Sequence, residues 1–346
     1  MPYRDGPISA GPRMARRSRV DRVPVTIIDA SGPQPSLPTV IECDGAEMPA
    51  LPWLHANRVV VENYLHSSGA ILLRGFHIDT AQFETIMDRL YGPLVAEHER
   101  SSPRHSVAPG VFTSTDHPAD QTIFLHNEMS YSATWPMRIA FLCVRAPEVG
   151  GQTPIADTRR VLRAIPADVR SRFIERGVMY VRNYGDGFGL PWQTTFDTED
   201  REVVERFCRD NGLIVEWKDR NRLRTRRIGA VVARHPVTGA TVWFNHATFF
   251  HVSTLAPELR DALAAEMAPE DLPTNSFYAD GSPIEDDILE TVRAAYLDAS
   301  TSFDWQVGDV LLLDNMLTAH GRSPFLGDRK IVVTMARPFT TTSAPA

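Results

Sequence analysis

Apolar and polar positions along the chain predict short strands separated by amphipathic helices. The run over residues 69–76 is apolar and bounded by glycines, which is typical of a buried strand. Within 82–91 the apolar residues recur at helical spacing, so a helix with one buried face is expected there. Residues 99–118 are rich in Ser, Pro, Thr and Asp and predict a long loop, a kind of segment that often carries function.

The rest of the chain continues this mixture without a regular strand–helix alternation. A helix is expected over 158–176 with a break at Pro166, and another over 198–211 with Thr198 as its N-cap and Gly212 as its stop. Further helices are expected over 257–267 and 285–299, and strands over 178–183, 213–217, 241–245, 309–314 and 330–336. The pattern predicts an α+β fold with an antiparallel jelly-roll core and inserted helices.

Composition narrows the class of protein. The 346 residues carry 43% apolar side chains and a net charge of -7, which allows a sizeable core and argues against nucleic acid as a partner. We expect one domain over 23–346, preceded by a basic, disordered tail over 1–22. No apolar run is long enough for a membrane span. Three isolated cysteines favour reduced thiols, buried as small apolar side chains, and a cytoplasmic location.

One short motif has the spacing of a metal site. His126 and Glu128 are two positions apart, so on a strand both side chains would leave the same face. His320 could supply a third ligand from a distant segment. Two imidazoles and one carboxylate on one face of an ion leave three positions open, which suits Fe(II) with a bidentate co-substrate and O2. Alone this motif is weak, and the other nine histidines are interpreted as surface or core residues.

The surroundings of the motif strengthen it. Downstream come Trp305, Gly308-Asp309, an apolar run ending in Asp314-Asn315, then His320 and Asp328-Arg329, and upstream His126-x-Glu128 is followed by Gly150-Gly-Gln-Thr153. Together these segments resemble the taurine dioxygenase and clavaminate synthase superfamily of Fe(II)- and 2-oxoglutarate-dependent oxygenases. The resemblance runs from about residue 69 to residue 338 and implies a double-stranded β-helix.

The resemblance also implies roles for two further residues. Arg329 would bind the distal carboxylate of the co-substrate 2-oxoglutarate, because a guanidinium can pair with a carboxylate through two parallel hydrogen bonds. The hydroxyl of Thr153 would donate to the same carboxylate. Without these neighbours, Arg329 would be interpreted as a solvated charge beside Asp328.

Within the superfamily the chain is most similar to the syringomycin-type amino-acid β-hydroxylases of nonribosomal peptide pathways. Supporting segments are 102–104, 126–131, 235–239 and 242–245. The implied substrate is a small amino-acid-like molecule, free or bound to a peptidyl carrier protein. Related enzymes often carry a second Arg four positions after the co-substrate Arg, where this chain has Val333. Substrate contacts are therefore expected from Arg104, Asn127, Tyr131, Trp135, Asn245 and Arg337, with Arg322 and the basic stretch 220–227 as further candidates.

Within the superfamily, the residue at the position of Glu128 distinguishes one type of reaction from another. Related halogenases replace this carboxylate with Ala or Gly so that chloride can bind, and its presence here favours hydroxylation of an unactivated C–H, with desaturation or cyclisation as alternatives. A zinc hydrolase could use the same three ligands, but HExxH is absent and Arg329 would have no role. A non-catalytic cupin-like binding protein is the remaining alternative. The sequence leaves the oligomeric state open.

Overall fold

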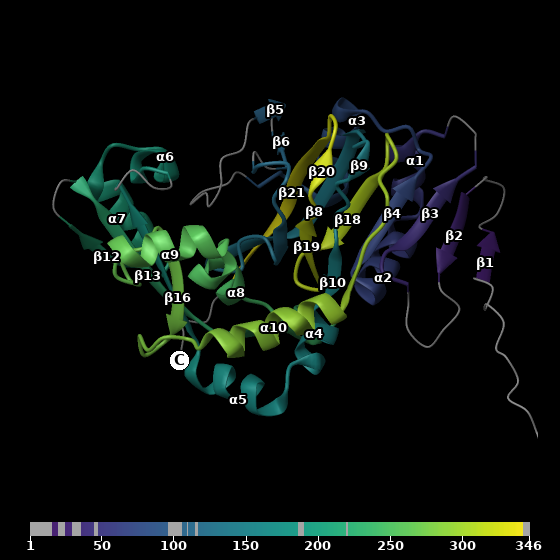
Figure 1. Cartoon of the computed structure of the whole chain (residues 1–346). Coiled ribbons are helices and arrows are strands. Elements are labelled where there is room, and N and C mark those ends of the chain that lie inside the picture. The colour runs from purple at the N-terminus through teal and green to yellow at the C-terminus, as the bar shows by residue number, and fades with distance from the viewer. Residues whose placement is uncertain are drawn as a thin grey trace, which may run out of the picture.

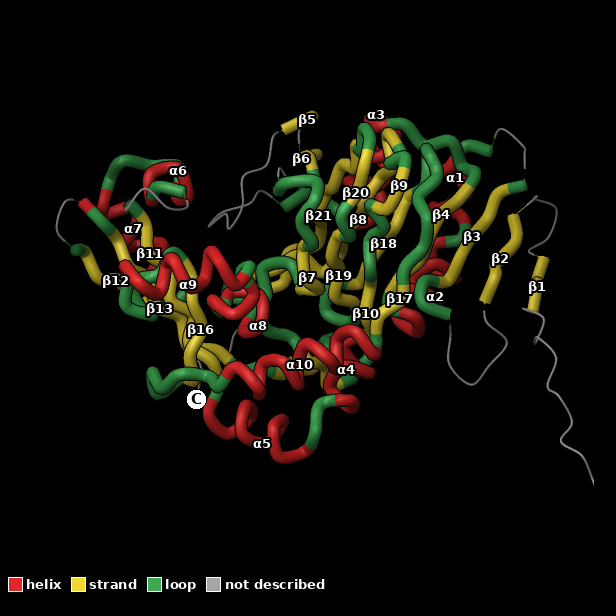
Figure 2. Tube along the Cα trace, in the orientation of Figure 1, coloured by secondary structure: helices red, strands yellow, loops and turns green. Residues whose placement is uncertain are grey.

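The structure is a computed structural model that describes residues 16–19, 25–29, 36–44, 48–95, 106–108, 110–114, 117–185, 190–218 and 221–341. A large sheet and a smaller sheet lie in one half of the molecule, and a separate four-stranded sheet with helices around it lies in the other (Figure 1). Helices α4, α5 and α10 lie along one side of both halves (Figure 2).

The large sheet forms the main wall of the β-sheet half. In the described residues its strand order is β1-β2-β3-β4-β18-β8-β21-β6-β5, and its neighbours pair antiparallel except for β3 and β4. The central strand β8 and the last strand β21 pair along almost their whole length. The strands are β1 Arg16–Arg19, β2 Val25–Asp29, β3 Thr39–Cys43, β4 Ala70–Arg74, β5 Ser106–Ala108, β6 Val111–Thr113, β8 Thr134–Arg145, β18 Val310–Asp314 and β21 Lys330–Thr340.

A smaller sheet faces the large one and completes the jelly roll. Its order is β17-β10-β19-β7, formed by β17 Ser300–Thr301, β10 Ile155–Asp157, β19 Thr318–Arg322 and β7 Ile123–His126. Apolar side chains of β4, β8, β18 and β21 pack with Ile155 of β10 and with Trp305 into a common core. Two short strands, β9 Val149–Gly150 and β20 Phe325–Leu326, pair beside it.

Three helices cover the outer face of the large sheet. They are α1 Ala50–Ala56, α2 Arg58–Ser68 and α3 Thr80–Tyr91. The buried face of α3 consists of Phe83, Ile86, Met87 and Leu90 with the final Tyr91, and its N-terminus is closed by a capping box between Asp79 and Gln82. These side chains join β3, β4, β8, β18 and β21 in a second apolar core, so the large sheet is buried on both faces.

The second half of the molecule is built on a four-stranded sheet of order β12-β13-β11-β16. Its strands are β11 Val178–Tyr184, β12 Ile214–Trp217, β13 Leu223–Gly229 and β16 Thr274–Tyr278, and β14 Val232–Arg234 pairs with β15 Thr241–Trp243 nearby. The helices are α4 Thr158–Ala164, α5 Ala167–Arg176, α6 Trp192–Phe196, α7 Arg201–Asp210, α8 Ala247–Phe250, the 3₁₀ turn η2 Val252–Thr254, α9 Pro257–Glu266 and α10 Asp286–Asp298.

The expected α+β fold with a jelly-roll core is confirmed. The expected break at Pro166 separates α4 from α5, and most predicted strands are present within a few residues. The helix expected over 198–211 begins instead at Arg201, because the Asp200 carboxylate accepts from the Glu202 amide and caps it there. The segment 99–118, predicted as a loop, contains β5 and β6, and β6 extends the large sheet along β21.

Other features of the sequence have simple counterparts in the structure. Each of the three cysteines lies in a different apolar cluster, as expected of small buried side chains. Of the predicted tail, Arg16–Arg19 form β1, and residues 1–15 and 20–22 lie outside the described residues, as does Arg104. Among the described helices, none has the length and apolar character that crossing a membrane requires.

Candidate metal centre and cavity

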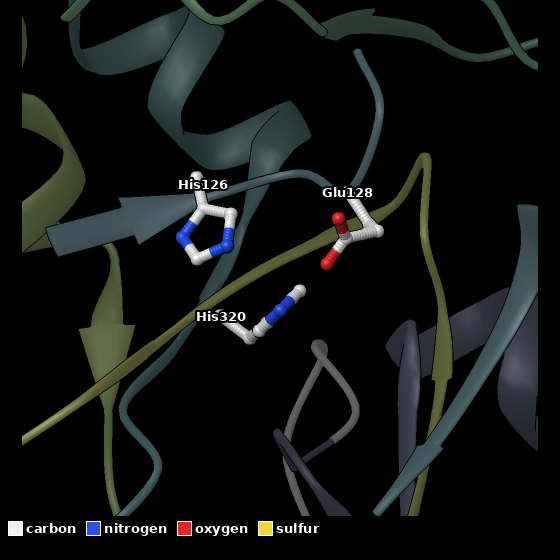
Figure 3. A group of neighbouring side chains, drawn as sticks. All are labelled: His126, Glu128 and His320. Carbon is white, nitrogen blue, oxygen red and sulfur yellow. The ribbon is translucent and has the colours of Figure 1, made fainter. Parts of the chain in front are cut away.

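The three predicted metal ligands meet at one place. His126 ends β7 and lies directly opposite His320 of β19 in the antiparallel pair, while Glu128 follows two residues beyond the strand end. The three side chains point toward one another (Figure 3), and their ligand atoms all lie within 4.8 Å of one another. This donor set, two imidazoles and one carboxylate, fits a single Fe(II) ion with open positions.

A backbone contact orients one of the imidazoles. The Nδ1 atom of His126 lies 2.9 Å from the carbonyl oxygen of Phe124. Because a carbonyl can only accept, Nδ1 carries the hydrogen and the lone pair of Nε2 is left for a metal. The ring of Phe249 packs on His126 with centroids 4.5 Å apart, and Phe141 lies 5.1 Å from His320. The candidate ligands are therefore held by strand pairing on one side and by aromatic rings on the other.

The triad opens into a cavity of about 810 Å³. Its inner end is formed by the triad with Phe141, Thr153 and Arg329. Its outer end is formed by α8, α9, the segments 121–124 and 254–259, and part of β16. Apolar side chains line much of the cavity wall: Ile123, Phe124, Leu255 and Leu259 lie at the outer end, and Phe249 and Phe250 of α8 lie between that end and the triad. A pocket of this size, in which apolar side chains stand beside polar and charged ones, is typical of a small-molecule site.

Arg329 turns into this cavity instead of pairing with its neighbour Asp328. Asp328 forms an exposed ion pair with Arg145, whereas the Nε of Arg329 donates to the carbonyl oxygen of Gly151 at 2.9 Å. Burial, together with the charge of Arg322, lowers the pKa of Arg329 to about 10, so the guanidinium stays charged at neutral pH. Gly151 has a φ of +67°, and a Cβ there would lie 3.0 Å from the Arg329 Cδ, so glycine makes room for this side chain.

Thr153 lies in the same wall of the cavity. It is buried, and its hydroxyl oxygen accepts a hydrogen bond from the Trp305 indole at 3.2 Å. A hydroxyl that accepts from an indole keeps its own hydrogen for another acceptor. Arg329 and Thr153 can therefore offer a partly buried cation and a hydroxyl donor to one carboxylate.

Comparisons with known proteins agree with this geometry. The profile of the family described as taurine catabolism dioxygenase TauD, TfdA family matches residues 36–335. The dapdiamide synthesis protein DdaC of Enterobacter agglomerans is 38% identical over 279 residues, which are 80% of this chain and 85% of that protein. A clavaminate synthase-like protein of Arabidopsis thaliana is 28% identical over 292 residues, 80% of this chain and 84% of that protein.

This chain belongs to the TauD/TfdA dioxygenase family. The crystal structure of PvcB from Pseudomonas aeruginosa has the same fold, with a TM-score of 0.55 at 17% identity over 94% of this chain and 95% of that chain. The resemblance predicted from the sequence is thus confirmed. As a TauD/TfdA member the chain is an oxygenase that uses iron, 2-oxoglutarate and O2.

Most residues predicted to contact substrate in this TauD/TfdA chain lie elsewhere. Asn127 and Asn245 are buried and donate to the backbone oxygens of Asn315 and Val231. Tyr131 packs against His246 and Phe250 behind the cavity wall. Trp135 packs between Phe244 and Phe339, and Arg337 is exposed on β21. None of these five residues lines the cavity, so substrate contacts from them stay a prediction that the geometry of the cavity does not support.

Arg322 is the candidate that does line the cavity. It is buried, and its guanidinium donates to the carbonyl oxygens of His117, Pro118 and Gln121. Within the stretch 220–227, Arg224 is instead buried against Asp271 and Asn183. The remaining cavity residues, above all those of α8 and α9, were not found from the sequence, because no local motif marks a segment that reaches the triad only through the fold.

Proposed function

We propose that the chain hydroxylates an unactivated C–H bond of an amino-acid-like substrate. In this proposal His126, Glu128 and His320 hold the iron, and Arg329 with Thr153 binds the distal carboxylate of 2-oxoglutarate. The observation that carries the proposal is that all five side chains line the inner end of one cavity. A zinc hydrolase would need the three ligands but would leave the partly buried cation at Arg329 without a use.

The chain's own residues orient the reactants and exclude water. Bound iron with 2-oxoglutarate and O2 supplies the oxidising chemistry. The Arg329 guanidinium fixes one end of the co-substrate, so its keto acid end can reach the triad. Phe141, Phe249 and Phe250 surround the triad with apolar surface, which keeps water from the reacting carbon. The Glu128 carboxylate takes the position that a halide would need, which favours oxygen transfer.

The substrate would occupy the outer end of the cavity. Val333 is buried in the core between the sheets, so the position used for substrate binding by many relatives carries no charge here. The guanidinium of Arg322 contacts only uncharged carbonyl oxygens in the described hydrogen bonds, so its positive charge remains available to an acidic group of the substrate. Similarity to the dapdiamide synthesis protein supports a role in the biosynthesis of a natural product. The β carbon is the position that we propose for the oxidation.

The direct test is turnover with a substrate panel. Purified protein with Fe(II), 2-oxoglutarate and O2 would be given free amino acids and the same aminoacyl groups as carrier-protein thioesters. We expect one substrate class to stimulate succinate release and to gain one oxygen atom by mass spectrometry. A product that has instead lost two hydrogens would identify a desaturase, and turnover without 2-oxoglutarate and O2 would identify a hydrolase.

A further inference from the structure

Glu128 lies where the strand ladder no longer holds the chain. It follows the end of β7 in a turn over residues 127–130, and the next residue, Met129, has a φ of +55°. Its backbone is held instead by the side chain of Asn315. The Glu128 amide donates to the Asn315 Oδ1 at 2.9 Å, and the Asn315 Nδ2 donates to the Glu128 carbonyl at 2.9 Å. One amide side chain thus satisfies both backbone polar groups of a candidate ligand.

Asn315 is itself fixed on every side. Its Nδ2 also donates to the Pro136 carbonyl at 2.9 Å, and its backbone amide donates to the carbonyl of Met137 at 3.1 Å. The side chain of Asn127, which lies between the two ligands in sequence, donates to the backbone oxygen of Asn315 at 2.6 Å. Asn315 and Asn127 are both fully buried. A buried side chain with this many partners has a single accessible orientation.

Asp314, the residue before Asn315, holds the turn that leads to His320. Asp314 accepts from the amides of Met316 and Leu317, in the turn that leads into β19 and His320. Its carboxylate is held in turn by Arg138 at 2.6 Å and by the His235 Nε2 at 3.0 Å. The turn between β18 and β19 therefore connects the segment that carries Glu128 with the segment that carries His320.

We propose that Asn315 is a positioning residue that sets the affinity of the triad for its metal. It acts through the backbone of Glu128 and does not contact the ion itself. The inference rests on the proposed function, since it takes the triad as the metal site. Without the two bonds from Asn315, the turn over 127–130 gains freedom, and a ligand carboxylate displaced by a fraction of an ångström no longer closes the coordination shell.

The test is metal affinity, measured without turnover. Apo protein would be titrated anaerobically with Fe(II), and with Co(II) as a stable substitute, by calorimetry. Asn315→Ala should weaken metal binding by about 10- to 100-fold, the range typical of residues that orient metal ligands. Asn183→Ala is the matched control, because Asn183 also donates to two backbone carbonyls, those of Glu270 at 2.8 Å and Leu272 at 2.7 Å. It should lower the unfolding midpoint and leave metal affinity unchanged.

Wild-type affinity in a folded Asn315→Ala protein would overturn the inference. If that variant does not fold, Asn127→Ala decides, since it removes only the bond to the Asn315 backbone: weaker metal binding supports the inference and unchanged binding refutes it. The metal site and the positioning role of Asn315 can be refuted separately. Wild-type protein that binds no metal at the triad would refute the metal site, whereas wild-type binding that survives both substitutions would refute only the positioning role.

Discussion

The two ends of the cavity are built in different ways. At the inner end, His126 and His320 come from paired strands and Glu128 from the turn after β7, and buried hydrogen bonds from Asn315 and Asp314 hold the turns. At the outer end, short helices and loops present side chains such as Leu255 and Leu259, which are largely exposed. The difference indicates that the reaction is fixed by the sheet, while substrate choice depends on segments that can change without disturbing the metal.

The largest effect is expected from removing a ligand at the inner end. Glu128→Ala should reduce metal binding drastically and take succinate release below detection, because one of three protein ligands is lost. Metal titration and a succinate assay would measure both. Glu258→Ala is the control for metal affinity: it removes the other carboxylate that lines the cavity, at the exposed rim. Full hydroxylating activity in Glu128→Ala would refute the triad as the metal site.

The buried charges behind the inner end should have a large effect on the free energy of unfolding. Arg138 is fully buried and donates to Asp314 and to Glu62 at 2.8 Å. Arg138→Met leaves Asp314 without its cation, so the free energy of unfolding should fall by about 3–5 kcal/mol in chemical denaturation. Arg145→Met, which breaks the exposed pair with Asp328, should cost below about 1 kcal/mol. Equal losses in both variants would contradict a special role for the buried network.

The buried pair of Arg138 and Asp314 predicts that the free energy of unfolding depends on pH. Burial alone would raise the pKa of Asp314, but the hydrogen bond from His235 and the charge of Arg138 outweigh it, so the pKa lies below its ordinary value. A carboxyl with a lowered pKa stabilises the fold above its unfolded pKa and loses that contribution as pH falls through its folded pKa. The difference in unfolding free energy between wild type and Arg138→Met should therefore be full at neutral pH and shrink below about pH 4.

Within the inner end, a substitution should be able to weaken co-substrate binding without weakening metal binding. Arg329→Ala removes the partly buried cation and should raise the KM for 2-oxoglutarate by about 100-fold, as expected for one partner of a hydrogen-bonded charge pair. Metal affinity measured without 2-oxoglutarate should stay near that of wild type. An unchanged KM for 2-oxoglutarate would mean that the co-substrate binds elsewhere.

The smallest effects are expected at the outer end. Leu259→Ala removes apolar contact area at the cavity wall, and burying a leucine against a ligand contributes about 1.5–3 kcal/mol at most. The KM for the organic substrate should rise by about 10-fold, with the KM for 2-oxoglutarate unchanged. Steady-state kinetics with each substrate varied in turn would measure this. A parallel rise in both constants would contradict the division of the cavity into two ends.

Motifs in the sequence marked the residues that lie together at the inner end, and their roles in binding iron and 2-oxoglutarate stay predictions. His126, Glu128, Thr153, His320 and Arg329 all line one cavity. Side chains close to a motif were not predicted equally well. Asn127 follows the end of β7, and its side chain turns away from the cavity to donate to the backbone of Asn315. Beyond the left-handed Met129 the chain turns away and takes Tyr131 into the core.

Among the strands that escaped prediction, β8 and β13 have charged residues that interrupt their apolar pattern. In β8 the fully buried Arg138 is compensated by Asp314 and Glu62, partners that are 176 and 76 residues away in sequence. In β13 the buried Arg224 contacts Asn183 and Asp271. Without the tertiary fold each Arg appears solvated, and the segment appears to be a surface stretch. The position of Phe249 likewise depends on the tertiary fold, because it contacts His126 only through the packing of α8 beside β7.

The central claim is that the inner end holds iron and 2-oxoglutarate together. The most direct test adds Fe(II) and then 2-oxoglutarate to the wild-type protein under anaerobic conditions and follows the visible spectrum. The account predicts a weak charge-transfer absorption that saturates at one iron and one 2-oxoglutarate per chain and is absent in Glu128→Ala. Folded wild-type protein that develops no such absorption with both components in excess would contradict it.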